Sequence, residues 1–182
     1  FSRIYWPLSG EGFVEHHGRI FRLIPGRLYI IPSNSPGRYW CPRRMNLDWF
    51  HFTAEVLGGV ELFDFYGCEY ETAVPKPERV SVGRQWDRLL KCFSSGSTPV
   101  AAETEALMRM LIVRFLRTAD LAGQEMRFRA YERFAPAMKY IEENISAEIV
   151  IGKVAERVNL QENYFTNLFT ANFGISPVRY IN

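Results

Sequence analysis

Residues 151–174 read IGKVAERVNLQENYFTNLFTANFG, and this stretch decides how the C-terminal part of the 182-residue chain folds. Apolar residues recur at helical spacing over 151–158 and again over 162–173, which predicts two short α-helices. A short break at 159–161 separates the two runs. Gly174 follows the second run, at the kind of position where glycine commonly ends a helix.

One further helix is expected on each side of this pair. Before it, residues 136–145 have helical spacing, and Pro136 suits the first turn of a helix. The inward apolar residues of this helix would be Met138, Ile141 and Ile145. After the pair, Ser176-Pro177 could begin another helix. The chain is therefore expected to be helical from about Phe134 onward.

Two helices joined by a turn of three or four residues can form a helix-turn-helix. Ala155 is small where the two helices would cross closely, and Val158 and Leu160 are apolar and would brace the turn. The polar residues expected on the outer side of the second helix are Asn163, Thr166, Asn167 and Thr170. Such a helix fits the major groove of DNA, where Asn can make bidentate contacts to adenine. A helical bundle with a polar outer face fits the same pattern, so the residues alone leave both interpretations open.

The composition favours a folded protein, with 47% apolar and 23% charged residues. No run of about 18 apolar residues is present, so no membrane span is expected. Cys41, Cys68 and Cys92 are odd in number and widely spaced, which suits neither a metal knuckle nor a disulfide framework. A reduced, cytoplasmic location is the simplest expectation.

The charge of the helical C-terminal part is close to neutral. From Phe134 onward there are four basic and five acidic residues, within a chain of net charge +2. Contacts to phosphates normally supply much of the affinity for DNA. Strong DNA binding by these residues alone is therefore not expected.

The first 80 residues are expected to form short strands, because apolar stretches alternate with turn residues. Residues 12–23 (GFVEHHGRIFRL) predict a hairpin that closes near His17-Gly18. Residues 27–31 and 47–52 predict two more strands, with a turn over 32–37 between them. Closely spaced turns of this kind suit a barrel or a sandwich.

Helical spacing begins after this region. Residues 83–93 would pack one side, formed by Trp86, Leu89, Leu90 and Phe93. After a polar break over 94–99, residues 100–121 form the longest expected helix. This helix is apolar over more than one face, so it must pack on two sides. Packing within its own chain and packing against a second subunit both remain open.

Two stretches resemble the AraC/XylS family of transcription regulators. Residues 136–181, PAMKYIEENISAEIVIGKVAERVNLQENYFTNLFTANFGISPVRYI, are similar to the first helix-turn-helix subdomain of that family, nearly without gaps. Residues 10–39, GEGFVEHHGRIFRLIPGRLYIIPSNSPGRY, followed by WFHF at 49–52, more loosely resemble its cupin-like sensor domain. Together the resemblances cover roughly two thirds of the chain, in the family's usual order.

The resemblance implies an α+β protein with three parts. Residues 1–80 would form a cupin-like, ligand-sensing β-barrel that is incomplete at its N-terminus. Residues 81–133 would be linker and dimerisation helices. Residues 134–182 would be the three-helix first helix-turn-helix subdomain, incomplete at its C-terminus, because the family's linker helix and second subdomain are absent from this chain.

Two departures from the family pattern affect the expected DNA contacts. Gln161 stands where the family usually has Ser, and Gln is a poor N-cap. The positions that match the base-contacting residues of the family are Asn163, Thr166 and Asn167. The family often has Arg or Gln there, so a different operator is implied.

The resemblance also implies an effector site inside the barrel, with a sugar as the common effector class. The implied lining residues are Ser9, Tyr39, Leu47 and Trp49. Trp49 could stack on a sugar ring or could simply belong to the core.

No metal, cofactor or catalytic site is expected. His16 and His17 are adjacent, and successive residues of a strand point to opposite faces, so the two cannot easily chelate one ion. His16 and His17 would instead form a polar hairpin end, and His51 would be a core or pocket residue. No nucleophile, base and orienting residue can be recognised together.

The sequence thus predicts a homodimeric, effector-controlled regulator that binds double-stranded DNA and is not an enzyme. The alternatives are a cupin-type sugar-binding or isomerase-like protein with a helical tail, and a ligand-binding module without DNA activity. Missing histidine ligands count against the enzyme, whereas the near-neutral C-terminal part suits the binding module.

Overall fold

A computed structural model describes residues 1–33, 37–56, 60–93 and 98–181. The chain forms two compact units, one of residues 1–53 with 68–119 and one of residues 54–67 with 120–182. This division does not coincide with the boundaries expected after residues 80 and 133. The turn expected over 32–37 and the polar break over 94–99 lie largely outside the described residues.

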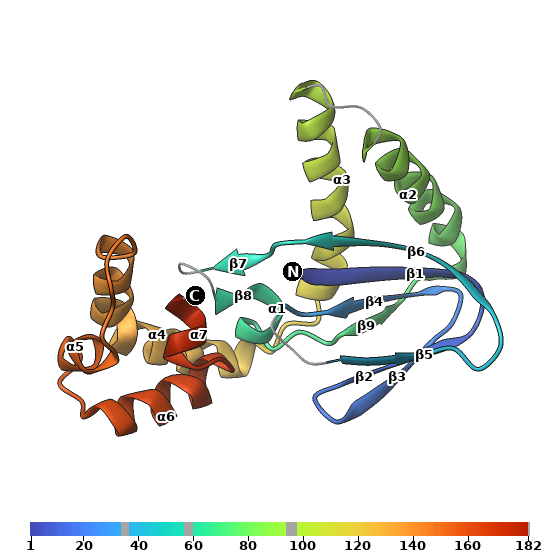
Figure 1. Cartoon of the computed structure of the whole chain (residues 1–182). Helices are drawn as coiled ribbons and strands as arrows, with labels where there is room; N and C mark the ends of the chain where they lie inside the picture. Colours follow the sequence, from blue (N-terminus) through green and yellow to red (C-terminus); the bar gives the residue numbers. More distant parts are fainter. Residues whose placement is uncertain (34–36, 57–59, 94–97, 182) are drawn as a thin grey trace. The chain divides into compact units, whose positions relative to one another are not determined.

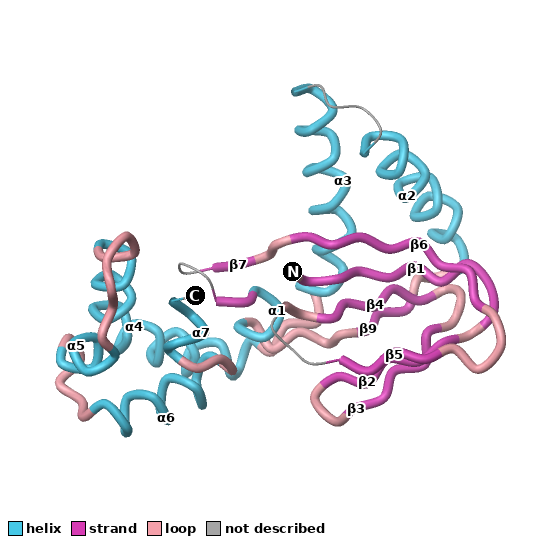
Figure 2. Tube along the Cα trace, in the orientation of Figure 1, coloured by secondary structure: helices cyan, strands magenta, loops and turns pink. Residues whose placement is uncertain are grey.

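The first unit contains two antiparallel sheets (Figures 1 and 2). The four-stranded sheet has the order β6-β1-β4-β9, with bounds β1 Ser2–Gly10, β4 Arg27–Ile31, β6 Met45–Phe52 and β9 Glu71–Ala73. The three-stranded sheet has the order β3-β2-β5, with bounds β2 Gly12–His16, β3 Arg19–Leu23 and β5 Gly37–Trp40. The strands expected over 12–23, 27–31 and 47–52 are therefore confirmed.

The β2–β3 hairpin closes at His17-Gly18, as expected from the sequence. His16 pairs with Arg19, so the loop contains two residues, whose φ angles are 49° and 73°. Two consecutive positive φ angles are the signature of a type I′ turn, whose twist matches that of the flanking strands. Gly18 adopts this backbone without the steric cost that a side chain would add.

The inner faces of the two sheets enclose one apolar core. Its buried residues are Tyr5, Val14, Phe21, Leu23, Tyr29 and Ile31, with Met45, Leu47 and Tyr70 packed against them. The Tyr29 hydroxyl donates to the carbonyl oxygen of Arg22 at 2.6 Å and accepts from the Ile24 N–H at 3.1 Å. Because this buried hydroxyl is satisfied, Tyr29 can fill the centre of the core without a desolvation penalty.

Two helices, α2 (Arg79–Phe93) and α3 (Thr98–Leu116), follow the short 3-10 turn η1 (Lys76–Glu78). Trp86 of α2 is fully buried and stacks on Phe50 of β6, with ring centroids 4.2 Å apart. The buried stripe of α2 is Val82, Trp86, Leu89 and Cys92. Leu90 and Phe93, which were expected on the same side, are not buried, at 43% and 61% exposed. The Phe93 ring still contacts that side, because its centroid lies 5.8 Å from that of Phe50.

Residues 100–121 do not form one helix, and α3 is not the longest helix of the described residues. It ends at Leu116, where the Thr118 hydroxyl donates to the Phe115 carbonyl oxygen at 2.6 Å. Asp120 then caps a new helix, α4 (Leu121–Glu143), by accepting from the Gly123 N–H at 3.1 Å. The cap separates two apolar segments that look continuous in the sequence.

The second unit is mainly helical (Figure 2). In chain order it contains β7 Glu55–Val56, β8 Val60–Glu61, α1 Leu62–Phe65, α4 Leu121–Glu143, α5 Ile151–Glu156, α6 Glu162–Phe173 and α7 Pro177–Ile181. The expected strand character of the first 80 residues is thus interrupted by α1 and η1. Among the described residues, no helix combines the length and the apolar character that crossing a membrane would need.

The helix expected to begin at Pro136 begins much earlier. Pro136 lies inside α4, because the Asp120 cap starts the helix at Leu121 and good helix formers follow. Proline inside a helix removes one backbone hydrogen bond and costs roughly 3 kcal/mol, which packing of the flanking turns must offset. Met138 and Ile141 are buried as expected, whereas Ile145 lies beyond the helix end and is 63% exposed.

Phe134 stands at the centre of the core of the second unit. Its ring centroid lies 5.8 Å from that of Phe165, 5.6 Å from that of Phe169 and 5.4 Å from that of Phe173. These tilted and edge-to-face contacts between large buried rings add to their apolar burial. The core therefore fixes one side of α6 to α4.

Candidate functional site

The turn between α5 and α6 is a Schellman motif. The Asn159 N–H donates to the Glu156 carbonyl oxygen, and the Leu160 N–H donates to the Ala155 carbonyl oxygen, each at 3.1 Å. Asn159 has a φ of 55°, the left-handed conformation that this motif requires and that Asn tolerates better than most residues. The short break read from the sequence at 159–161 is thus a defined turn that sets the direction in which α6 leaves α5.

The beginning of α6 lacks a side-chain cap, as expected from Gln161. The Gln161 backbone is extended and its side chain makes no capping hydrogen bond. The bounds of α6, Glu162–Phe173, are those read from the sequence, and Gly174 ends the helix with a φ of 71°. Local signals therefore position this helix, although no side chain caps its first turn.

The outer side of α6 carries a polar surface, which we call the outer face and define as Asn163, Thr166, Asn167 and Thr170. Asn163, Asn167 and Thr170 are exposed, and Thr166 is half-buried. The Thr170 hydroxyl donates to the Thr166 carbonyl oxygen at 2.7 Å, so it is partly occupied by its own helix. The two asparagine amides therefore remain the groups best placed to reach another molecule.

The opposite side of α6 is fully committed to the core. Phe165 and Phe169 are 0% exposed, and Phe173 is nearly buried. Ala155 of α5 is also fully buried in this core, as its small size led us to expect. With its inner side buried in this way, α6 presents the outer face to solvent.

Two basic residues lie in the sequence shortly before α6, in and just after α5. Lys153 and Arg157 are exposed, and the Arg157 guanidinium lies 4.4 Å from the centre of the Tyr140 ring. Arg157 was not identified as a site residue from the sequence, because nothing local distinguishes it from other exposed arginines. The stacking on Tyr140 restrains the Arg157 side chain.

The residues implied for effector binding do not all meet on one face. Trp49 lies opposite Tyr5 on neighbouring strands, and Leu47 lies opposite Pro7, so these residues share the inner face of the sheet. Ser9 lies opposite Asn46, because the register shifts between Pro7 and Ser9. Successive residues of β6 point to opposite faces, so Ser9 is turned away from Leu47 and Trp49.

The other implied effector residues differ in their surroundings. Leu47 packs against the core between the sheets and Trp49 is 51% exposed. Tyr39 of β5 lies opposite the buried Val14, and its hydroxyl accepts a hydrogen bond from the Arg3 guanidinium. This bond joins the two sheets of the unit.

A polar cluster beside Tyr39 consists of residues that sequence reasoning missed: Arg3, Tyr5 and His16. The tyrosine rings of Tyr5 and Tyr39 are 6.4 Å apart. Burial, followed by the neighbouring Tyr39, raises the pKa of Tyr5. Arg3 could have been noticed as a charged residue within the apolar run SRIYWP, where a strand buries both of its faces.

His16 is the deepest member of this polar cluster. Its side chain is 1% exposed, and neither ring nitrogen has a hydrogen-bond partner among the described residues. Burial, and then the charges of His17 and Arg3, lowers the pKa of His16 to about 4. At neutral pH, His16 is therefore an uncharged imidazole beside the Tyr70 ring, 4.8 Å away.

The described residues contain no group of three metal-ligating side chains. His16 and His17 lie at the hairpin end, but the expectation of a polar end is only half right because His16 is buried. His51 is exposed beside Trp49, with ring centroids 4.9 Å apart, so of its two expected positions the core is wrong and the pocket stays a prediction.

Comparison with known proteins gives a limited result. No protein-family model and no curated protein matches the chain. Among solved structures, the AraC-like transcriptional activator CuxR is similar with a TM-score of 0.46 and 12% identity, covering 99% of this chain and 64% of CuxR. A ligand-free ToxT variant from Vibrio cholerae is similar with a TM-score of 0.37 and 8% identity, covering 99% of this chain and 88% of ToxT.

The chain therefore spans less than two thirds of the length of CuxR. At these low TM-scores and identities, the likeness by itself assigns neither a fold family nor a function to this chain.

Proposed function

We propose that this protein is a DNA-binding transcription regulator of the AraC type, in which α5 and α6 form a helix-turn-helix and α6 lies in the major groove. The observation that carries the proposal is the two-sided character of α6. One side is locked into the core by Phe165, Phe169 and Phe173, and the other presents Asn163 and Asn167 to solvent. The resemblance of residues 136–181 to the first helix-turn-helix subdomain of the family supports the same assignment.

The proposed division of contacts follows from the side-chain chemistry. Asn163 and Asn167 would read base edges, since an amide can pair with the N6 and N7 atoms of adenine. Lys153 and Arg157 would contact phosphates and fix the register without reading sequence. With so few basic residues nearby, the affinity of this unit alone would be low, and a further DNA-binding subdomain or a second subunit would supply the rest.

The sheets of the first unit would bind a small-molecule effector, with a sugar as the favoured class. A cupin-like barrel remains part of this proposal. Arg3 and His16 of the polar cluster, together with Tyr39, would provide hydrogen bonds, and Trp49 would provide a stacking surface for a sugar ring. The effector would act in the cytoplasm by binding one arrangement of a homodimer more tightly than another.

The dimer would form through α3. Met110 and Val113 of this helix are 53% and 40% exposed, whereas Leu111 and Phe115 are buried within the unit. Burying these exposed apolar side chains against a second subunit would be more favourable than leaving them in contact with water.

The proposal is tested by measuring DNA binding with the complete natural protein and the DNA upstream of its own gene. Replacing Asn163 and Asn167 by Ala should weaken specific binding by about tenfold or more, since one good bidentate contact is worth roughly 1–3 kcal/mol. Asn172→Ala is the matched control, because Asn172 is exposed on the same helix but donates to the Leu168 carbonyl oxygen. Equal effects of the two changes would contradict a reading role for the outer face.

A second candidate function is a ligand-binding module without DNA activity, or a cupin-type isomerase-like protein with a helical tail. The near-neutral charge of residues 134–182 favours the binding module. Binding of a sugar, measured by calorimetry, together with no specific binding in the DNA-binding measurement above would support the binding module, and turnover of the sugar would support the enzyme.

A further inference from the structure

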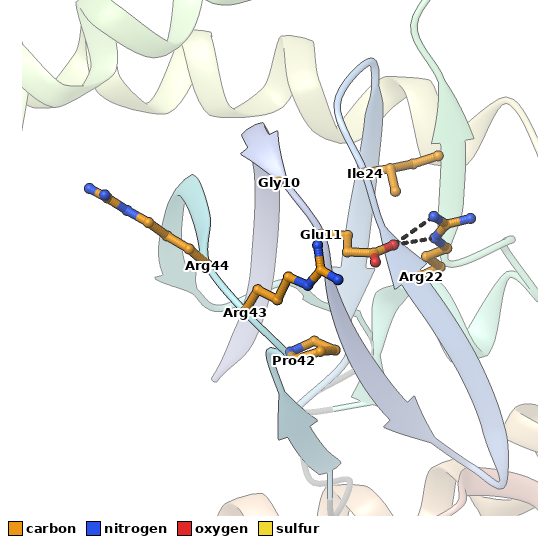
Figure 3. A pocket seen from close by; sticks show the side chains of 7 residues that line it. All are labelled: Gly10, Glu11, Arg22, Ile24, Pro42, Arg43 and Arg44. Atoms are coloured by element: carbon orange, nitrogen blue, oxygen red, sulfur yellow. Dashed lines mark hydrogen bonds and ion pairs between the residues drawn. The ribbon is translucent and has the colours of Figure 1, made fainter.

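An open pocket of about 650 Å³ lies at the end of β1 in the first unit (Figure 3). Its lining residues come from the β1–β2 link, the end of β3 and the β5–β6 connection: Gly10, Glu11, Arg22, Ile24, Pro42, Arg43 and Arg44. Three arginines and one glutamate leave an excess of two positive charges, which gives this region, here called the arginine pocket, a strong preference for anions.

The backbone of the arginine pocket is held by close packing. Gly10 has a φ of 74°, and a side chain at this position would clash with the carbonyl oxygen of Arg44. The Cys41 thiol donates to the carbonyl oxygen of Glu11 at 3.4 Å. These two contacts, one on each side of Pro42, fix the connection that carries Arg43 and Arg44 against the end of β1.

The charged side chains of the pocket have distinct roles. The Arg22 guanidinium is held by Glu11, with Nε and Nη2 at 2.7 and 2.6 Å from Oε2. The Arg43 side chain points toward this pair, whereas Arg44 points away from it (Figure 3). Within the described residues, neither Arg43 nor Arg44 forms an ion pair. The pocket therefore offers one positioned guanidinium, one free guanidinium facing it and a third that adds charge at the rim.

We propose that the arginine pocket binds a small molecule that carries a phosphate group, with Arg22 and Arg43 as its direct partners. The planar fork of a guanidinium matches the oxygens of phosphate, and such charge-assisted pairs are the strongest of their kind. A phosphate monoester carries about −1.5 to −2 charges at neutral pH, which balances the excess of the pocket better than one carboxylate does. The volume also lies within the range of ligand pockets, roughly 300–1,000 Å³.

This site is separate from the proposed effector site. Gly10 and Arg3 lie at opposite ends of β1, seven residues apart, which corresponds to roughly 23 Å of strand. The proposal does not depend on DNA binding, because all of its residues belong to the first unit.

The test is isothermal titration of the purified chain at low salt with glucose 6-phosphate, inorganic phosphate and glucose. We expect both phosphate compounds to bind at the arginine pocket, and any binding of glucose, which would occur at the separate effector site, to be unchanged by Arg43→Gln. Arg43→Gln should weaken glucose 6-phosphate binding by about tenfold or more, and Arg44→Gln by less, since only Arg43 faces the pocket. Arg84→Gln is the matched control, because Arg84 is an exposed arginine of α2 in the same unit.

A second variant is expected to change the affinity in the opposite direction. Glu11→Gln removes the one negative charge of the pocket and frees Arg22, so binding of glucose 6-phosphate should become tighter. The proposal is overturned if neither phosphate compound binds, if Arg84→Gln weakens binding as much as Arg43→Gln, or if Glu11→Gln weakens it. A response to duplex DNA with none to the small probes would also overturn it.

Discussion

At the residue scale, His16 combines full burial with two unpartnered ring nitrogens within the described part of the chain. Such a group costs free energy unless it is neutral or finds a partner. Its lowered pKa means that the folded protein keeps the neutral imidazole at pH values where an unfolded chain is already protonated. His16 therefore links the stability of the first unit to pH.

The expected result is a loss of stability in acid. The pKa of His16 is about 4 in the folded chain and 6.5 ordinarily, so the unfolded state binds more protons between these values. The contribution of neutral His16 is fully present above pH 6.5 and is lost as the pH falls toward 4, by about 1–3 kcal/mol. The measurement is urea unfolding followed by tryptophan fluorescence, since Trp6, Trp40, Trp49 and Trp86 all lie in the first unit.

Comparing the pH dependence of the free energy of unfolding between variants separates the effect of His16 from the titration of carboxylates. His16→Phe should flatten the slope between pH 6.5 and 4. His17→Asn should retain most of the slope, because burial is the largest cause of the lowered His16 pKa and the charge of His17 is a smaller one, and Asn tolerates the positive φ of 49°. An unchanged slope in His16→Phe would show that other groups carry the acid sensitivity.

At the element scale, the α5–α6 turn depends on one left-handed residue. Asn159→Gly should leave the stability of the second unit unchanged or slightly higher, because glycine is the preferred residue at this position of the Schellman motif. Asn159→Val should lower it by about 1–2 kcal/mol, since a β-branched residue is poorly accommodated at positive φ. Urea unfolding followed by far-UV circular dichroism gives both values.

The same pair of variants also examines the proposed function. If α6 binds DNA in the orientation set by this turn, Asn159→Val should weaken specific binding and Asn159→Gly should not. A large loss of stability in the glycine variant would contradict the Schellman assignment of the turn.

At the scale of the whole molecule, the second unit is discontinuous in sequence. Val60 and Phe65, from residues 54–67, are buried in the same core as Phe134, Phe165 and Phe169. The C-terminal helices therefore depend on a segment that lies well before them in the chain. A destabilising substitution within residues 54–67 is therefore expected to affect the stability of the second unit and not of the first.

Phe65→Ala should destabilise the second unit by about 3–5 kcal/mol, the usual cost of removing a buried ring. The unfolding transition seen by far-UV circular dichroism should then shift to lower urea, while the tryptophan transition of the first unit should stay in place. Phe93→Ala is the control, because Phe93 belongs to the first unit and is 61% exposed. A shift of the tryptophan transition alone would place residues 54–67 with the first unit.

The sequence by itself determined the elements that local signals specify: the hairpin at His17-Gly18, strand 27–31, and α6 with its end at Gly174. Periodicity and turn residues act over a few neighbours, so they can be read directly. The exposed positions Asn163, Asn167 and Thr170 of α6 followed from the same periodicity, whereas Thr166 is half-buried.

The tertiary structure alone decided which distant residues meet. It turned Ser9 away from the face of Leu47 and Trp49 through a register shift, joined Arg3 to Tyr39, and buried His16. It also continued α4 through Pro136, where the preference of proline for the first turn predicted the start of a helix. Each of these outcomes depends on packing between segments far apart in the chain, and that packing outweighs local preferences of about 1 kcal/mol per residue.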